Sequence, residues 1–236
     1  MQQTSTKQTI YQKNIYMLEF INRVKNPGSG GIPAFEKGVI AIGQELGINP
    51  NWIMAVMFIE SRCNPQAVNS GSHATGLIQF TKTTAKELLN TTVEHIKTLT
   101  AYQQLPYVKT YLKKQKGKRK INSLIDTYLL VFFPAAIGQS NDYVLKTKNR
   151  SAAYFASLNS GYDINDDKKI TKGEVERSIM KTLTENGYKG GTGTNLFANS
   201  NGVDWASSAY GSGNGSSSII SNTWKRSYDD FNPNIA

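Results

Sequence analysis

Apolar residues recur at helical spacing along most of the chain, and no clear run of alternating polar and apolar residues predicts a β-strand. The pattern predicts helices over Ala34–Leu46, Pro50–Ser61, Thr83–Leu89, Val93–Lys116, Asn122–Phe133, Arg150–Leu158 and Thr171–Asn186. We therefore expect residues 33–186 to form one compact, mainly α-helical domain.

Two segments of different character flank this domain. Residues 1–32 contain a further helix, expected over Thr9–Lys25, and a hinge at the breaker NPGSGG. Residues 187–236 form a C-terminal arm, and 21 of the 36 residues from Gly187 to Asn222 are Gly, Ser or Asn. This composition predicts flexibility in isolation. Aromatic residues spread along the arm favour binding to a partner surface, with a plain linker as the alternative: Trp205, Tyr210, Trp224, Tyr228 and Phe231.

The charge is strongly positive, with 27 Lys and Arg against 17 Asp and Glu. Such a protein is expected to adhere to polyanions. Six of the eight residues in Lys113–Lys120 are basic, but no aromatic residues interleave, so the run does not favour specific nucleic-acid binding. A solvated loop is one interpretation, and contact with cell-wall polyanions is the other.

The sequence predicts neither a disulfide nor a membrane span. Cys63 is the single cysteine, which excludes an intramolecular disulfide and favours a packing role. The first twenty residues lack the pattern of a secretion signal, and the apolar run from Tyr128 to Ile137 has half the length of a span. We expect a product made in the cytoplasm without a signal peptide.

The helix predicted from Pro50 has an unusual end. Apolar residues occupy every position from Trp52 to Ile59, which indicates a helix buried on all sides, and Glu60 follows. Apolar surroundings and the negative end of the helix dipole both favour the protonated form of this carboxyl group. A general acid needs that form. The alternative is that Glu60 merely marks the point where the helix reaches water.

The residues around Glu60 resemble those of soluble lytic transglycosylases and goose-type lysozymes. The string MAVMFIESRCNPQAVN carries a Glu-Ser helix end at Glu60-Ser61, and ATGLIQFTKTTA carries the Gly-Leu-x-Gln segment at Gly76–Gln79. The third motif of that family, Ala-Tyr-Asn-x-Gly, has a counterpart in Ser157–Gly161, with Leu158 in place of the tyrosine. Tyr154 or Tyr162 is a candidate for the missing ring.

The resemblance implies a lysozyme-like helical fold that cleaves the MurNAc-GlcNAc bond of peptidoglycan. Glu60 would protonate the leaving oxygen and then act as base, while the substrate's own C6 hydroxyl attacks. The remaining site residues would be Ser61, which orients Glu60, Gln79 and Asn159, which contact the sugar, Phe80, which lines the cleft, and Tyr128, which is also a candidate core residue. An ordinary hydrolase would need a second carboxylate, for which the candidates are Asp126, Asp142 and Glu87.

The segment DINDDKKITKGE, residues 163–174, fits the EF-hand pattern at every ligand position and predicts a structural Ca²⁺ ion. The expected ligands are Asp163, Asn165, Asp167, the carbonyl of Lys169, Thr171 and Glu174. Lys168 stands where the pattern has glycine, at a cost of about 1–2 kcal/mol for a left-handed backbone. The alternative is a capping box, since Thr171 and Glu174 have that spacing at the start of the next helix.

The leading hypothesis is a peptidoglycan lytic transglycosylase or muramidase that needs no cofactor for its chemistry. Without a signal peptide, and with a capping helix and an aromatic arm, it resembles virion-associated wall-penetrating enzymes of bacterial viruses. Its partners would then be peptidoglycan and other virion proteins, and it would act on the host cell wall. The alternatives are a structural particle protein whose lysozyme-like domain binds glycan without cleaving it, and a calcium-regulated binding protein.

Overall fold

The computed structural model describes residues 17–190, and this part of the chain is mainly helical. The α-helices are α1 (Gly31–Leu46), α2 (Pro50–Ser61), α3 (Val93–Thr98), α4 (Ala101–Lys116), α5 (Leu124–Phe132), α6 (Ala152–Leu158) and α7 (Lys172–Glu185). Shorter helical turns are η1 (Ile21–Arg23), η2 (Thr84–Leu88), η3 (Pro134–Ala136) and η4 (Ser160–Tyr162). Within residues 17–190 the β structure is limited to isolated bridges, which confirms the predicted fold class.

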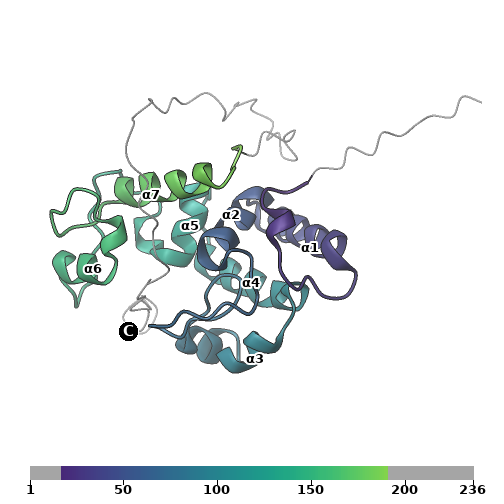
Figure 1. The fold of residues 1–236 in the computed structure, drawn as a ribbon. Helices are drawn as coiled ribbons and strands as arrows, with labels where there is room; N and C mark the ends of the chain where they lie inside the picture. Colours follow the sequence, from purple (N-terminus) through teal and green to yellow (C-terminus); the bar gives the residue numbers. More distant parts are fainter. Residues whose placement is uncertain (1–16, 191–236) are drawn as a thin grey trace, which may run out of the picture.

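Helix α2 lies in the middle of the bundle and packs against α1, α5 and α7 (Figure 1). Its residues from Ile53 to Phe58 are all buried, as the unbroken apolar run predicts. The helix begins where the sequence indicates: the side chain of Asn49 accepts a hydrogen bond from the Asn51 amide, and Pro50 occupies the first turn. The predicted bounds of this helix are confirmed.

The helix predicted over Val93–Lys116 is instead two helices, α3 and α4, separated at Leu99 and Thr100. Thr100 forms a capping box with Gln103, which starts a new helix at Ala101. The amide of Ala101 donates to the Asn26 carbonyl at 2.9 Å, so it is not available to continue a helix from the preceding turn. The local capping box and the contact with a distant segment together set the break.

The other predicted helices are present with shifted ends. Residues 84–88 form a π-helical turn, η2, where an α-helix over Thr83–Leu89 is expected. Helices α5 and α6 begin two residues later than predicted because Ser123 and Ser151 are their N-caps.

The N-terminal helix expected over Thr9–Lys25 differs in its described part, and residues 1–16 lie outside the described range. Residues 17–25 contain a turn and the single 3₁₀ turn η1, with Phe20 in a left-handed conformation at φ 58°. Leu18, Phe20, Ile21 and Val24 are buried in the core. The C-terminal arm beyond residue 190 also lies outside the described range, so its order stays a prediction.

The first described residues pack on the C-terminal half of α2, and the last described residues pack on these first residues. The Phe20 ring stacks on Phe58 at 4.0 Å and on Tyr188 at 6.0 Å. The amide of Lys189 donates to the Glu19 carboxylate at 3.3 Å. The two segments, 17–23 and 186–189, line a shared surface hollow. They are thus held next to each other.

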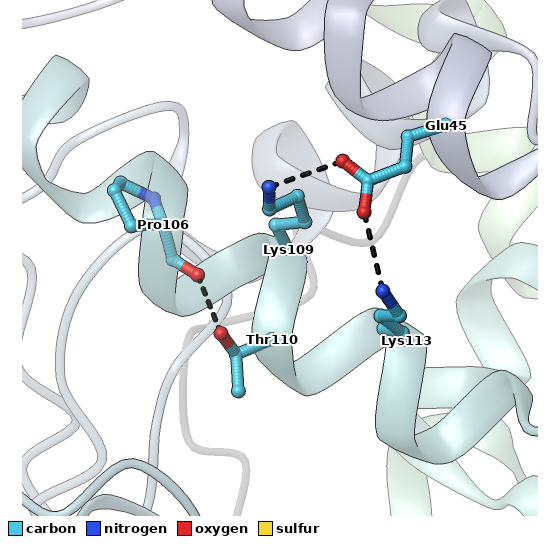
Figure 2. Close-up of polar contacts among 5 residues, drawn as sticks. All are labelled: Glu45, Pro106, Lys109, Thr110 and Lys113. Atoms are coloured by element: carbon cyan, nitrogen blue, oxygen red, sulfur yellow. Dashed lines mark hydrogen bonds and ion pairs between the residues drawn. The ribbon is translucent and has the colours of Figure 1, made fainter.

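Helices α1 and α4 are joined on their exposed side by one carboxylate. Glu45 accepts from Lys109 at 3.0 Å and from Lys113 at 3.3 Å (Figure 2). Both hydrogen bonds lower the pKa of Glu45, and the bond from Lys109 has the larger effect. Because all three side chains are exposed, water and salt screen the attraction and the pairs contribute little to stability.

None of the helices formed by residues 17–190 is long and apolar enough to span a membrane.

We expect the thiol of Cys63 to resist alkylation in the folded protein. The residue is completely buried, and burial raises the pKa of Cys63 from its ordinary value of 9.0 to about 12. At pH 8 iodoacetamide should therefore label the native protein on the order of 1,000-fold more slowly than protein unfolded in urea, since the thiolate is the reactive form. Equal labelling rates would contradict the packing role.

The same raised pKa predicts that the free energy of unfolding falls as the pH rises from about 9 towards about 12. Across this window the unfolded chain releases the Cys63 proton while the folded chain retains it, so proton loss favours unfolding. Urea unfolding at pH 7 and at pH 10 should show a smaller pH dependence for Cys63→Ala than for the unsubstituted protein.

Candidate active site

Glu60 lies partly buried in the last turn of α2, immediately before the helix ends. The ending is abrupt because Arg62 and Cys63 both adopt left-handed conformations, at φ 55° and 57°. Their amides donate back to the carbonyls of Phe58 and Met57, at 2.9 and 3.2 Å, and so close the last turn. The guanidinium of Arg62 covers the Phe58 ring at 4.5 Å, and burial lowers the pKa of Arg62.

Ser61 connects the first two motifs of the predicted site. Its buried hydroxyl lies 3.0 Å from the Met57 carbonyl and 2.9 Å from the carbonyl of Leu77, in the Gly-Leu-x-Gln segment. The sequence predicts that Ser61 orients Glu60 itself. In the structure the hydroxyl fixes the loop that follows against the helix end carrying Glu60, and the orienting role of Ser61 stays a prediction.

Gln79 holds the second motif in shape. It adopts a left-handed conformation at φ 55° and is 7% exposed. Its side-chain amide donates to the carbonyls of Gly76 at 3.0 Å and Ala67 at 3.3 Å. The side-chain nitrogen of Gln79 is therefore already hydrogen-bonded within the loop, and the sugar contact predicted for this residue stays a prediction.

A fully buried amide from α4 clasps this loop from behind. The side-chain oxygen of Gln104 accepts from the Leu77 amide at 2.9 Å, and its nitrogen donates to Pro65 at 2.7 Å and to Ile96 at 2.9 Å. Gly76 makes the approach possible, because a Cβ there would lie 2.6 Å from the Gln104 oxygen. All the hydrogen-bonding capacity of the Gln104 nitrogen and one site on its oxygen go to backbone groups.

The third motif is tied to α5 by a pair of tyrosines. Asn159 ends α6, and its carbonyl accepts from the Tyr162 amide at 2.9 Å. The hydroxyls of Tyr162 and Tyr128 are 2.6 Å apart and buried. Burial raises the pKa of Tyr162, and the hydrogen bond to Tyr128 opposes this shift only in part. Tyr162, one of the two candidates for the missing ring, thus lies beside Tyr128, whereas Tyr154 is exposed.

Two candidate substrate-binding residues, Phe80 and Tyr128, lie in the core, which is the alternative that the sequence left open for Tyr128. Phe80 is 1% exposed and meets the ring of Tyr111 edge-on. Tyr128 is 2% exposed and stacks against Phe132. Their aromatic rings are packed among apolar neighbours, so the predicted role of Phe80 as a cleft-lining side chain is not supported by its position.

The three candidates for a second carboxylate are either bound to neighbouring groups or exposed. Asp126 accepts from the amide of Asn122 and lies 3.8 Å from the ammonium group of Lys172. Asp142 is exposed and accepts from the Ser140 hydroxyl, which lowers the pKa of Asp142. Glu87 is exposed on η2.

The EF-hand-like segment connects η4 to α7 and starts directly after Tyr162. The capping box expected as the alternative is present, because Thr171 and Glu174 exchange hydrogen bonds. Among residues 17–190, no three His, Cys, Asp or Glu side chains are gathered closely enough to hold a metal ion. The carboxylates predicted to bind calcium, Asp163, Asp167 and Glu174, are therefore not gathered around one point, and calcium binding, with Asn165 and Lys169 among the expected ligands, stays a prediction.

The basic run Lys113–Lys120 occupies the last turn of α4 and the loop after it. Positive side chains at a helix C-terminus are favourable because the helix dipole is negative there. Lys113 is paired with Glu45, and Lys114, Lys118, Arg119 and Lys120 are exposed. This arrangement agrees with the solvated interpretation and leaves polyanion binding a prediction.

One comparison with known proteins gave a match. Residues 38–105, from within α1 to the second turn of α4, match the family model of the transglycosylase SLT domain. The matched range includes Glu60, Ser61 and the loop that Gln104 clasps. No curated protein and no solved structure matched the chain.

We expect Gln104→Leu to destabilise the protein strongly. Leucine is similar in size but leaves three buried backbone groups without their hydrogen bonds, at about 1–3 kcal/mol each. The free energy of unfolding in urea should fall by roughly 3 kcal/mol or more. Gln115→Leu, on the same helix but partly exposed, is the control and should change it by less than about 1 kcal/mol. Similar effects for both variants would contradict the clasp.

Proposed function

We propose that the protein is a peptidoglycan lytic transglycosylase and that Glu60 is its general acid and base. The family match supports this assignment, because it covers the helix end with Glu60 and the loop bound to it. The observation that carries the choice of residue is the position of Glu60 in the last turn of a buried helix.

The matched range offers four carboxylates: Glu45, Glu60, Glu87 and Glu94. Glu45 is exposed and paired with two lysines, which keep it ionised. Glu87 and Glu94 are also exposed. Glu60 is the one of these four carboxylates that is partly buried. Partial withdrawal from water generally favours the protonated form that a general acid needs.

The chemistry needs one such group. Glu60 would donate its proton to the glycosidic oxygen as the bond from that oxygen to C1 of MurNAc breaks. The C6 hydroxyl of the same sugar would then attack C1 and return its proton to Glu60. The products are a free hydroxyl on the leaving sugar and a 1,6-anhydro ring, and the carboxyl group is restored.

A hydrolytic route would need a second carboxylate beside Glu60, whereas the transglycosylase route needs none. Asp126 lies near a lysine, Asp142 is held by Ser140, and Glu87 is exposed on η2. A paired mechanism requires two carboxyl groups at a defined separation across the substrate.

The site of action, which the sequence predicts to be the wall of a cell entered by a virus particle, stays a prediction.

Glu60→Gln should abolish the release of anhydro-muropeptides from purified peptidoglycan, with a rate loss of at least about 100-fold. Glutamine keeps the size of the side chain but cannot donate a carboxyl proton. Mass spectrometry of the soluble products distinguishes anhydro ends from reducing ends. Glu94→Gln changes an exposed carboxylate of the same matched range, so it is the control and should retain activity.

Reducing ends in the products of the unsubstituted protein would indicate a hydrolase and a second carboxylate. If the unsubstituted protein releases no product but still binds peptidoglycan in a sedimentation assay, the enzyme assignment is wrong. The glycan-binding particle protein would then be the better description.

A further inference from the structure

A buried carboxylate oxygen near the EF-hand-like segment has no hydrogen-bond donor. Glu174 is 2% exposed, and its Oε2 accepts from the amide and the hydroxyl of Thr171, both at 2.8 Å. Its Oε1 is buried, and no residue in the described part of the chain donates to it. Burying a carboxylate oxygen without a donor or a cation is costly. Oε1 of Glu174 is therefore a candidate ligand for a cation.

The unpartnered oxygen belongs to the twelfth position of the calcium pattern. The carboxylate of Glu174 is turned back onto Thr171, the ninth position, so it lies against the segment that would hold the ion. At the other end, the oxygens of Asp163 accept from the amides of Asp167 and Lys168 at 3.1 and 3.0 Å. Local hydrogen bonds thus already order both ends of the segment.

The departure from the pattern at Lys168 does not prevent the required backbone. Lys168 adopts φ 62°, the left-handed conformation that glycine usually supplies at this sixth position. Its side chain is exposed, so the ammonium group can stay in water. The substitution weakens binding through strain and charge but leaves the turn intact.

The second half of the segment is fixed by the chain's own residues 143–145. The Leu145 amide donates to the carbonyl of Ile170 at 2.8 Å, and the Lys172 amide donates to Tyr143 at 2.9 Å. Val144 and Thr171 form an antiparallel bridge. Ile170, at the apolar eighth position, is completely buried. Residues 143–145 therefore support the segment where a second EF-hand loop would otherwise pair with it.

Both ends of the segment are anchored to α5 or to the chain that follows it. Tyr162, directly before Asp163, is hydrogen-bonded to Tyr128 of α5. Lys172, in the first turn of α7, donates to the Gln139 carbonyl at 2.9 Å and lies 3.8 Å from Asp126 of α5. The stretch between these anchors is mostly exposed, so an ion bound there would act on the third motif through Tyr162.

We propose that residues 163–174 bind one Ca²⁺ ion and that the ion closes the segment and fixes Asn159 and Tyr162 against α5. The ligands are Asp163, Asn165, Asp167, the carbonyl of Lys169, Thr171 and Oε1 of Glu174. Because the carboxylates are not gathered in the structure, binding draws Glu174 and the two aspartates together. The link to Asn159 deepens the proposed function and rests on it, whereas ion binding is measured without reference to glycan cleavage.

Calorimetric titration of the full chain with CaCl₂, after removal of divalent ions by a chelator, tests the site directly. We expect one ion per chain with a Kd between about 10⁻⁵ and 10⁻³ M, and a Tm that rises with the calcium concentration. Asp163→Asn and Glu174→Gln should each weaken binding at least about 10-fold. Glutamine can still serve in the capping box, so Glu174→Gln separates loss of the ligand from loss of the cap.

Asp166→Asn is the matched control. It removes the same charge from the exposed fourth position, which supplies no ligand, and should change the Kd by less than about 3-fold. Hydrogen exchange at the amides of Tyr162 and Asp163, which donate to the carbonyls of Asn159 and Ser160, should slow when calcium is added.

The absence of calcium binding up to 10 mM, or binding that Asp163→Asn and Glu174→Gln leave unchanged, would overturn the proposal. Binding without slower exchange at Tyr162 would overturn the link to the third motif. Neither outcome depends on peptidoglycan cleavage, so a failure here is distinguishable from a failure of the transglycosylase assignment.

Discussion

The side-chain amide of Gln104 is the contact on which the geometry of the proposed site depends. It is completely buried and hydrogen-bonds to the backbone at Pro65, Leu77 and Ile96, three points that are distant in sequence. An irregular loop cannot bury its backbone groups unless each one finds a partner. Gln104 of α4 supplies partners for two backbone groups of the loop, at Pro65 and Leu77, and residues 74–80 of the loop lie buried inside the protein.

The fixed loop supports the end of α2, which carries Glu60. The hydroxyl of Ser61 reaches from the helix to the carbonyl of Leu77, the residue whose amide Gln104 holds. Glu60 is therefore next to a chain of contacts that runs from α2 through the loop to α4. The burial of α2 on all sides adds rigidity, because Ile53–Phe58 leave no apolar face exposed. A proton-transferring group benefits from such support, since small displacements weaken proton transfer.

Local patterns predicted much of the fold and part of the site. The bounds of α2 follow from Asn49, Pro50 and the unbroken apolar run, and the first two motifs pointed to the region that the family match covers. The break before α4 was missed, although Thr100 and Gln103 carry the spacing of a capping box. Helical periodicity on both sides concealed that signal. The amides of Ala101 and Tyr102, in the first turn of α4, also donate to the carbonyls of Asn26 and Pro27. These long-range hydrogen bonds strengthen the break, and no local pattern predicts them.

Other site features depend on tertiary contacts that no local pattern contains. Phe80 follows the Gly-Leu-x-Gln segment directly, yet its ring turns into the core against Tyr111. The role of Gln104 could not be predicted, because a glutamine in a helix has no signature for three backbone partners. The neighbourhood of Tyr162 and Tyr128 joins residues 34 positions apart. Such pairings are set by how α5 and η4 pack, and a single sequence does not show that packing.

The stacking of Phe20 between Phe58 and Tyr188 places the first and last described residues side by side. A domain with adjoining entry and exit points can be inserted into a surface loop of another protein without stretching either chain. It can also be circularly permuted through a short connecting peptide. The described part of this chain thus has the geometry of a domain that a larger assembly could carry at a single point of attachment.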